Sequence, residues 1–377
     1  MRAIYQNPPD KWPAPSVDST VKWKEIGLLP ENEYSKILRK DGDPKLRTRV
    51  ELGKMLFFDP RISGSGQLAC ASCHEAELGW SDGRSTSFGH TRKELTRNAP
   101  TLLNIGLANQ LFWDGRAKDL EDQARQVLMN PDEMKSSPDV IGKLSAVPAY
   151  SKKFAAVFGD EEITFDRAAE MLAEFQRSIV GGRSRFDFFL KGRPEMLPDD
   201  AVIGLHLFRT QANCMNCHNG PNFSDNQFHN LGLTYYGREK YEDFGRYNIT
   251  KDPADMGKFK TPTLRNVERT RPYMHNGLFE LTGVLNMYNA GMPDVKPRPD
   301  QVGDPLFPKK SPLLRPLNLN RQEMNFIIAF LESLSEPASR VRVDLPPDVK
   351  DEQSVSKPSH SLDNSKIPGD PVRDGTE

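Results

Sequence analysis

Hydrophobic residues recur at helical spacing in several separate stretches of the chain. In one of the clearest, Ala168, Met171, Leu172 and Phe175 fall on one face of a helix, at positions i, i+3, i+4 and i+7. Two glycines at positions 181 and 182 end this pattern. Periodicity of this kind predicts helices over residues 45–58, 117–130, 140–158, 164–180, 200–210, 280–289 and 321–335.

The stretches between and beyond these helices are polar or rich in proline. Residues 1–30 carry five prolines and are typical of an extended arm, and residues 219–258 are rich in Gly and Asp and are predicted to be mostly loop. From Asp344 onward, prolines lie among Ser, Asp and Lys with almost no aromatic residues. Because such a composition buries too little apolar surface to fold, residues 344–377 are predicted to be a disordered tail.

Composition and charge narrow the class of protein. The 377 residues carry a net charge of −1, which gives no electrostatic basis for binding nucleic acid. The mean hydropathy is −0.63, and no apolar run approaches the roughly 18 residues that cross a membrane. We therefore expect neither a nucleic-acid partner nor a membrane span.

One five-residue pattern, C-x-x-C-H, occurs twice, as Cys70-Ala71-Ser72-Cys73-His74 and as Cys214-Met215-Asn216-Cys217-His218. It is the attachment signature of c-type haem, in which two thiols form thioether bonds to the porphyrin and the imidazole binds the iron. The two motifs use all 4 cysteines of the chain. Short disulfides would not require a histidine after each pair, and a zinc site usually has a further Cys or His pair nearby. The sequence therefore predicts two covalently bound c-type haems.

The sequence before the two motifs also repeats. Leu56-Phe57 precedes the first motif as Leu207-Phe208 precedes the second, and a glycine stands three residues before each leucine, at Gly53 and Gly204. The motif histidines, at positions 74 and 218, are 144 residues apart, which is the size of a small domain. We expect a mainly α fold with two cytochrome-c-like helical domains that carry one haem each. The predicted parts are an extended arm (1–45), a first domain (46–190), a second domain (191–343) and the tail (344–377).

Covalent haem attachment also predicts a cellular location. The attachment machinery works outside the cytoplasm, typically in the bacterial periplasm, so a periplasmic protein is expected. Residues Met1 to Tyr5 lack the basic and long apolar regions of a secretion signal. We therefore expect this sequence to be a processed or trimmed form of an exported protein.

Further motifs resemble those of the bacterial di-haem cytochrome c peroxidases and their MauG-type relatives. The resemblance runs from about Glu51 to Ser335 and implies an oxidoreductase that acts on hydrogen peroxide. The motifs that carry it are Arg97-Asn98-Ala99-Pro100-Thr101, Phe112-Trp113-Asp114-Gly115-Arg116, Asp122-Gln123-Ala124, Asn130-Pro131-Asp132-Glu133-Met134, Thr261-Pro262-Thr263-Leu264-Arg265-Asn266 and Pro272-Tyr273-Met274-His275-Asn276-Gly277.

The resemblance implies roles for several residues around the haems. His74 and His218 would be the proximal iron ligands, and Trp113 would lie between the haems as an electron relay. Gln123 and Glu133 would line the peroxide pocket, where Glu133 would move a proton during cleavage of the O–O bond. From the residues alone, Glu133 could instead cap a helix, Gln123 could lie on a helix surface and Trp113 could be a core aromatic.

The sixth iron ligands decide whether a haem transfers electrons or reacts with peroxide. His90 falls where the peroxidases have the displaceable sixth ligand of the first haem, and a solvated loop histidine is the alternative. At the second haem the resemblance favours Tyr288, which is the MauG-type choice. Met274 and His275 are further candidates, and the helical phase leaves Met287 and Met292 open as ligands in place of Tyr288.

The resemblance also implies a calcium ion and partners. Asn98 and the main-chain carbonyls of Thr270 and Pro272 fall where the family binds calcium between its domains. A small redox protein, either a cytochrome c or a cupredoxin, would supply electrons, and the protein would form a homodimer.

Three functions are compatible with these residues. The first is a periplasmic peroxidase that reduces hydrogen peroxide to water with electrons from the small donor. The second is a MauG-type enzyme that oxidises residues of a partner protein through high-valent haem. Tyr288 favours this second function, whereas His90, and Ala212 in place of the MauG-type tryptophan, argue against it. The third is a dihaem electron carrier without enzymatic activity, in which both irons would have six ligands.

Overall fold

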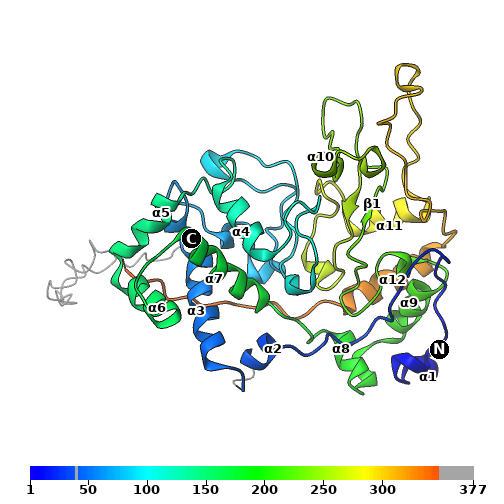
Figure 1. The fold of residues 1–377 in the computed structure, drawn as a ribbon. Helices are drawn as coiled ribbons and strands as arrows, with labels where there is room; N and C mark the ends of the chain where they lie inside the picture. The colour runs from blue at the N-terminus through cyan, green and yellow to red at the C-terminus, as the bar shows by residue number, and fades with distance from the viewer. Residues whose placement is uncertain (39–40, 348–377) are drawn as a thin grey trace, which may run out of the picture. The chain divides into compact units, whose positions relative to one another are not determined.

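The computed structural model describes residues 1–38 and 41–347 (Figure 1). The chain from Met1 to Leu345 forms one compact unit. Of the predicted tail, residues 344–347 are described and adopt neither helix nor strand. The remainder of that prediction lies outside the described residues.

Helices dominate the structure, so the mainly α class is confirmed. The one sheet in the described part of the chain pairs β1 (Phe228–His229) with β2 (Phe259–Lys260) in antiparallel register. The helices in chain order are α1 (Arg2–Tyr5), α2 (Glu33–Leu38), α3 (Pro44–Phe58), α4 (Leu120–Met129), α5 (Pro138–Gly142), α6 (Pro148–Phe158), α7 (Phe165–Arg177), α8 (Arg185–Leu190), α9 (Asp199–Arg209), α10 (Tyr247–Thr250), α11 (Leu281–Asn289) and α12 (Arg321–Ser333).

Local capping signals explain why most helices lie close to their predicted limits. The Asp43 carboxylate accepts a hydrogen bond from the Lys45 backbone N–H at 2.9 Å, and Pro44 occupies the first helical position of α3. Asn320 and Glu323 form a reciprocal capping box at the start of α12. These contacts satisfy N–H groups that would otherwise lack partners in the first turn.

The single helix predicted over residues 140–158 is wrong. The structure has α5 and α6 there, joined by a 3-10 turn, and α6 begins at Pro148. A proline lacks the N–H needed inside a helix and disfavours helical backbone at the preceding residue, so the chain starts a new helix at this point. The short helix α8 was not predicted, because its six residues are too few to show a period.

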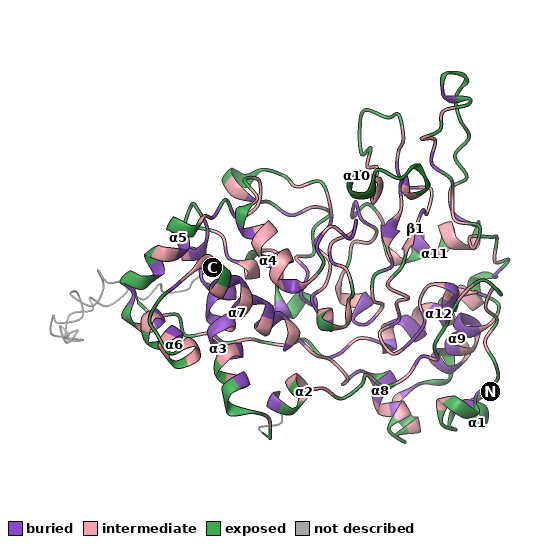
Figure 2. Cartoon of the chain, viewed as in Figure 1, coloured by how far each residue is buried: buried purple, intermediate pink, exposed green. Residues whose placement is uncertain are grey.

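Two large clusters of buried hydrophobic side chains lie within the compact unit. Figure 2 colours all buried residues of the cartoon purple, whatever their polarity. The first cluster is built mainly from α3 to α7, and we call residues 44–177 the first half. The second is built mainly from α8, α9 and α12, and we call residues 185–333 the second half. The proposed domain boundaries around residues 190 and 343 stay predictions.

The same helix crossing occurs once in each half and uses the repeated glycines. A Cβ on Gly53 of α3 would stand 1.8 Å from the carbonyl oxygen of Met171 in α7, and one on Gly204 of α9 would stand 1.9 Å from that of Phe326 in α12. Because real side chains do not approach so closely, glycine is what allows these backbones to touch. The helix before each haem motif is thus fixed against the last long helix of its own half.

Each core also receives side chains from the distant end of the chain. Tyr5 and Trp12, in the N-terminal arm, belong to the core of the second half. Val341 and Val343, which follow α12, pack against the core of the first half. The arm is therefore anchored to the protein at individual side chains, although it contains little regular structure.

Candidate functional site

The first C-x-x-C-H motif presents a histidine whose ring is held by a backbone carbonyl. His74 Nδ1 donates to the carbonyl oxygen of Trp80 at 3.0 Å, and Trp80 adopts a left-handed φ of 64°. This bond leaves Nε2 as the ring nitrogen that can bind a metal. Burial lowers the pKa of His74, so the imidazole is held in the neutral form that a metal ligand requires.

The second motif repeats this arrangement. His218 Nδ1 donates to the carbonyl oxygen of Phe223 at 3.0 Å, and Phe223 has a left-handed φ of 52°. All four cysteines are free, so the disulfide alternative is wrong. Burial raises the pKa of Cys70 and of Cys214 to about 12. Each motif therefore offers two unpaired thiols and one oriented imidazole, which fits a covalently attached haem.

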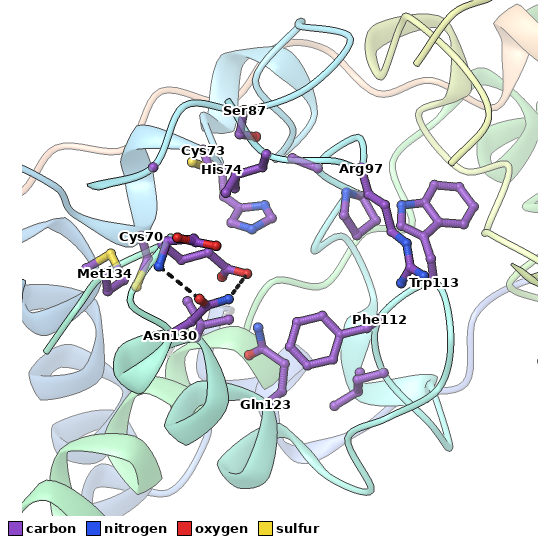
Figure 3. A pocket seen from close by; sticks show the side chains of 18 of the residues that line it. Cys70, Cys73, His74, Ser87, Arg97, Phe112, Trp113, Gln123, Asn130 and Met134 are labelled. Atoms are coloured by element: carbon purple, nitrogen blue, oxygen red, sulfur yellow. Dashed lines mark hydrogen bonds between the residues drawn. The ribbon is translucent and has the colours of Figure 1, made fainter. Parts of the chain in front are cut away.

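A cavity opens beside the first motif (Figure 3). The structure brings to it the three side chains predicted to act in catalysis, each from a different segment: the loop before α4, the helix α4 and the turn after it. Gln123 is half-buried on α4 and lines this cavity, and its catalytic role stays a prediction. The cavity is lined by Cys70, Cys73, His74, Trp113, Gln123 and Glu133, among other residues.

Glu133 lies in a turn and does not cap a helix, since α4 ends at Met129 and a turn follows. Asn130 Nδ2 donates to Glu133 Oε1 at 2.9 Å and fixes the carboxyl group. Burial raises the pKa of Glu133, while the positive charge of Arg116 and the hydrogen bond from Asn130 act in the opposite direction. The site thus holds a proton-exchanging group with a raised pKa beside the first motif.

Trp113 lies in a wall that separates two cavities. It lines the cavity of the first motif and also that of the second, as do Asn98, Ala99 and Pro100. Trp113 Nε1 donates to the carbonyl oxygen of Asn98 at 2.9 Å. The indole is therefore fixed between the two sites and is not an ordinary core aromatic.

The second cavity is lined by three of the five sixth-ligand candidates, Met274, His275 and Tyr288. Cys214, Cys217, His218 and Tyr288 line it, whereas Met287 and Met292 do not. Burial raises the pKa of Tyr288 well above its ordinary value. The phenol of α11 therefore faces the same space as the second motif histidine.

His90 does not line the first cavity, although Ser87, Phe88 and Gly89 of the same loop do. The backbone N–H of His90 donates to the carbonyl oxygen of Asp132 at 3.0 Å. Its Nδ1 is buried without a hydrogen-bond partner among the described residues. The loop of His90 is thus attached to the turn that carries Glu133.

The three residues predicted to bind calcium border the same cavity, and the calcium site stays a prediction. Asn98, Thr270 and Pro272 all line the second cavity. Asn98 Nδ2 donates to the carbonyl oxygen of Arg84 at 2.8 Å, so the amide oxygen is the side-chain atom left to bind a cation.

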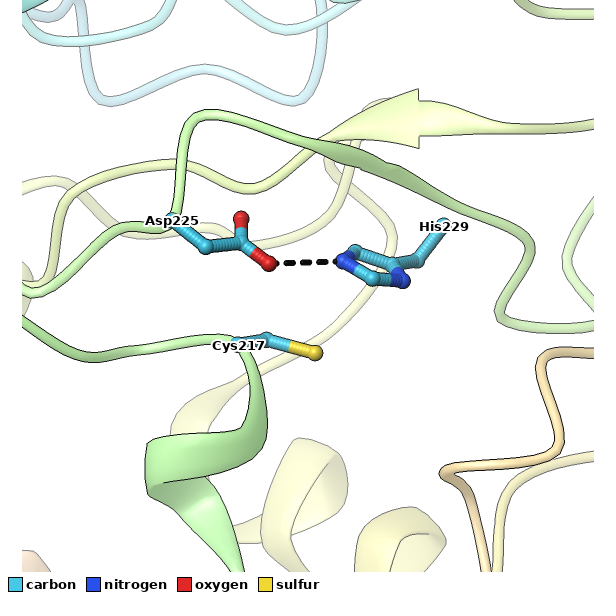
Figure 4. Close-up of side chains that lie close together, drawn as sticks. All are labelled: Cys217, Asp225 and His229. Carbon is cyan, nitrogen blue, oxygen red and sulfur yellow. Dashed lines mark hydrogen bonds and ion pairs between the residues drawn. The ribbon is translucent and has the colours of Figure 1, made fainter. Parts of the chain in front are cut away.

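Some contacts of the site could not be predicted from the sequence. Asn130 belongs to a predicted motif, but its bond to Glu133 depends on the local turn. A second example is the group of Cys217, Asp225 and His229, whose ligand atoms lie within 4.8 Å of one another (Figure 4). His229 Nε2 lies 2.8 Å from Asp225 Oδ2. Because haem attachment uses the Cys217 sulfur, this group is better explained as part of the second haem wall than as a separate metal site.

Fold and site together define a helical protein with two c-type haem attachment sites. Residues 47–195 match the family model described as di-haem cytochrome c peroxidase. The chain is 40% identical over 252 residues to the cytochrome c551 peroxidase of Nitrosomonas europaea, which covers 67% of this chain and 75% of that protein. It is 38% identical over 310 residues to the methylamine utilization protein MauG of Methylorubrum extorquens, covering 81% and 83%.

A solved structure agrees with these relatives. The crystal structure of a MauG-like protein associated with microbial copper homeostasis has a TM-score of 0.69 and 29% identity, over 85% of this chain and 96% of that chain. The chain belongs to the di-haem cytochrome c peroxidase family, to which MauG is related. Membership implies two c-type haems. In the described part of the chain, each helix is too short or too polar to cross a membrane.

Proposed function

We propose that this protein is a periplasmic peroxidase that reduces hydrogen peroxide to two waters at the first haem. Electrons enter at the second haem from a small redox protein, a cytochrome c or a cupredoxin. The observation that supports this most is the asymmetry of the two cavities. Both share the wall that contains Trp113, but Glu133 and Gln123 line the first cavity and not the second. Each haem, when bound, supplies a redox-active iron.

Glu133 is proposed to move the proton that peroxide cleavage requires. Breaking the O–O bond is easier when a proton passes from one peroxide oxygen to the other, so that water leaves. The Glu133 carboxylate accepts the proton from the near oxygen and returns it to the far one. Burial brings its pKa closer to the pH at which the enzyme works. Gln123 donates a hydrogen bond from its amide and orients the peroxide.

Trp113 is proposed to carry electrons between the two haem sites. Its Nε1–H is bonded to the carbonyl of Asn98, which is too weak a base to remove a proton. An indole that gives up an electron in this place keeps its proton and is quickly reduced again. This behaviour suits a relay better than a site that stores an oxidising equivalent.

We propose Tyr288 as the sixth ligand of the second iron, since it lines the cavity where Met287 and Met292 do not. A phenolate ligand stabilises the oxidised iron. We propose His90 as the displaceable sixth ligand of the first iron. Its ring does not line the first cavity, but Ser87, Phe88 and Gly89 of the same loop do, so a movement of this loop would be needed to bring the imidazole to the iron.

Three features of the assembly are also proposed. Residues 46–190 and 191–343 form two cytochrome-c-like domains with one haem each. A calcium ion lies between them, bound by the Asn98 side chain and the carbonyl oxygens of Thr270 and Pro272. The protein forms a homodimer.

A second function is favoured by one observation. Tyr288 in the second cavity is the choice of MauG-type enzymes, which oxidise residues of a partner protein. In that case the wall at Trp113 would carry electrons from the partner to the first haem. His90 and the absence of a tryptophan at Ala212 argue for the peroxidase instead.

Turnover of hydrogen peroxide by the holoprotein with reduced cytochrome c distinguishes the two functions. It is measured on fully ferric protein and on protein reduced by one electron. Rapid turnover that requires the one-electron reduction is the result expected for a peroxidase controlled by His90. If peroxide is not turned over and the ferric protein gives a long-lived oxidised spectrum, the MauG-type function is supported instead.

A further inference from the structure

A group of aromatic side chains leads away from the first cavity by a route that does not include Trp113. Phe244 lines that cavity. Its ring centroid lies 6.0 Å from that of Tyr236 and 6.4 Å from that of Tyr247. Two tyrosines therefore contact one ring that borders the first haem site, at nearly equal separations.

The two tyrosines differ in their hydrogen bonds. The Tyr236 hydroxyl donates to Asp304 Oδ2 at 2.5 Å, and the other carboxylate oxygen accepts from the Leu306 backbone N–H at 2.9 Å. Asp304 is thus held in place by two bonds. The Tyr247 hydroxyl has no protein hydrogen-bond partner within residues 1–38 and 41–347, although its ring also contacts Phe244.

Two loops bring this pair to the surface. Tyr236 follows β1, and Asp304 belongs to the long loop after α11, and both loops project from the same side of the molecule in Figure 1. They are joined by the Arg298 guanidinium, which donates to the Gly237 carbonyl oxygen at 3.1 Å. Tyr236 and Asp304 are half-buried, so dissolved molecules can reach the pair.

The carboxylate changes what Tyr236 can do. A phenol that loses an electron becomes a very strong acid, so its oxidation is far easier when a base takes the proton in the same step. The hydrogen bond from Tyr236 lowers the pKa of Asp304, which keeps the carboxylate ionised and able to accept. Trp113, whose N–H meets a carbonyl, has no such base.

We propose that Tyr236 is a second oxidation site, which removes oxidising equivalents from the first haem when the electron donor is scarce. One electron passes from Tyr236 through the contact with Phe244 to the peroxide-oxidised haem site, and the hydroxyl proton passes to Asp304. The products are a neutral tyrosyl radical, a protonated carboxyl group and a haem site reduced by one electron. A small one-electron reductant in solution restores the phenol. The inference rests on the proposed function, because peroxide at the first haem supplies the oxidant.

The test is electron paramagnetic resonance of the holoprotein frozen shortly after hydrogen peroxide is added without a reductant. The expected result is a tyrosyl signal, identified by its change when the protein contains ring-deuterated tyrosine. Y236F loses this signal, and the matched variant Y247F keeps it. In D304N the tyrosine remains but the base is lost, so the radical forms about a hundredfold more slowly.

Peroxide turnover with reduced cytochrome c is measured on the same samples. Y236F is expected to turn over peroxide at the wild-type rate but to lose activity sooner in excess peroxide without a donor. A full signal in Y236F, or no signal in a wild-type protein that turns over peroxide, overturns the inference and leaves the proposed function intact. A wild-type holoprotein that does not react with peroxide overturns both.

Discussion

The two halves of the molecule share one scaffold and differ in what lines their cavities. In each half a motif histidine is held by the carbonyl of a left-handed aromatic residue, Trp80 in the first and Phe223 in the second. In each half a glycine lets the helix before the motif touch the last long helix. The first cavity adds Glu133 and Gln123, whereas the second adds Tyr288. The scaffold positions a haem, and the lining residues decide its chemistry.

The repetition extends to the segments that close each half. Asn104 has a left-handed φ of 58°, its N–H donates to the Ile179 carbonyl oxygen, and its side chain accepts from Gly181 N at 2.8 Å. Asn266 has a φ of 63° and makes the equivalent bonds. Its N–H donates to the Leu334 carbonyl oxygen, and its side chain accepts from the Glu336 backbone N–H. A duplicated unit would produce this correspondence.

The largest expected effect concerns the asymmetry of the cavities. E133Q removes the proton-transfer group from the first cavity and should lower peroxide turnover about 100- to 10,000-fold, with two haems still attached. Stopped-flow mixing of the half-reduced holoprotein with hydrogen peroxide measures it. D139N, at an exposed carboxylate of α5 that does not line the first cavity, is the control and should stay near the wild-type rate. Equal activity of E133Q and wild type would contradict the catalytic role.

A buried ion pair occurs in the second half and not at the corresponding position of the first, and its removal tests this difference between the halves. Arg265 and Asp187 are both fully buried, with Nη1 and Oδ1 3.0 Å apart. Arg265 lies three residues after Pro262, and the residue three positions after Pro100 in the first half is Leu103, which has no charge. D187N leaves the guanidinium charge buried and uncompensated, so the free energy of unfolding should fall by about 3–5 kcal/mol in urea titration.

The exposed pair of Arg2 and Asp199 is the matched control for that variant. D199N should change the free energy of unfolding by less than about 1 kcal/mol, because solvent screens an exposed pair. Similar values for D187N and D199N would show that the second half does not depend on its buried pair.

Because the two helix crossings are equivalent, substitution of either glycine is expected to lower the free energy of unfolding by a similar amount. G53A and G204A each place a methyl group against a carbonyl oxygen, and each should lower the free energy of unfolding by about 1–3 kcal/mol or more. G283A, in α11, meets no atom within 4 Å and should instead stabilise the helix by roughly 0.5–1 kcal/mol. Thermal melts of the holoproteins give the comparison. A marked loss in one crossing variant alone would break the symmetry.

The smallest expected effect is a shift in the pH dependence of peroxide turnover. The positive charge of Arg116 lowers the pKa of Glu133, so R116Q should raise that pKa further. Glu133 must be ionised to accept a proton, and turnover is therefore lost as pH falls through its pKa. The acid limb of kcat/KM against pH should move to higher pH in R116Q. In R125Q, which removes the exposed pair with Asp166, the limb should not move; a shift to lower pH in R116Q would contradict the argument.

Much of the fold follows from signals that lie within a few residues of one another. Asp43-Pro44 sets the start of α3, and the Asn320 to Glu323 capping box sets the start of α12. The periodicity does not reveal the break at Pro148, because the apolar spacing continues through the proline. The new helix that starts there turns the same hydrophobic face toward the core.

The site was harder to predict because it depends on contacts between distant segments. Met287, Tyr288 and Met292 lie on or just after one short helix, and its period could not identify the side chain that faces the cavity. Tyr236 and Asp304 are 68 residues apart on two loops that have no periodic pattern. Such pairs appear once the backbone is known, since loop conformation and not residue spacing brings them together.

Each terminal segment of the chain packs on the half that is farther from it in sequence, and this limits how the protein can be divided into fragments. The N-terminal arm supplies Tyr5 and Trp12 to the core of the second half, and the segment after α12 supplies Val341 and Val343 to the core of the first. A cut between the halves would therefore separate each core from some of its own side chains. Each half is therefore tied to the other by a terminal segment as well as by the shared wall at Trp113, and the two halves are expected to unfold together.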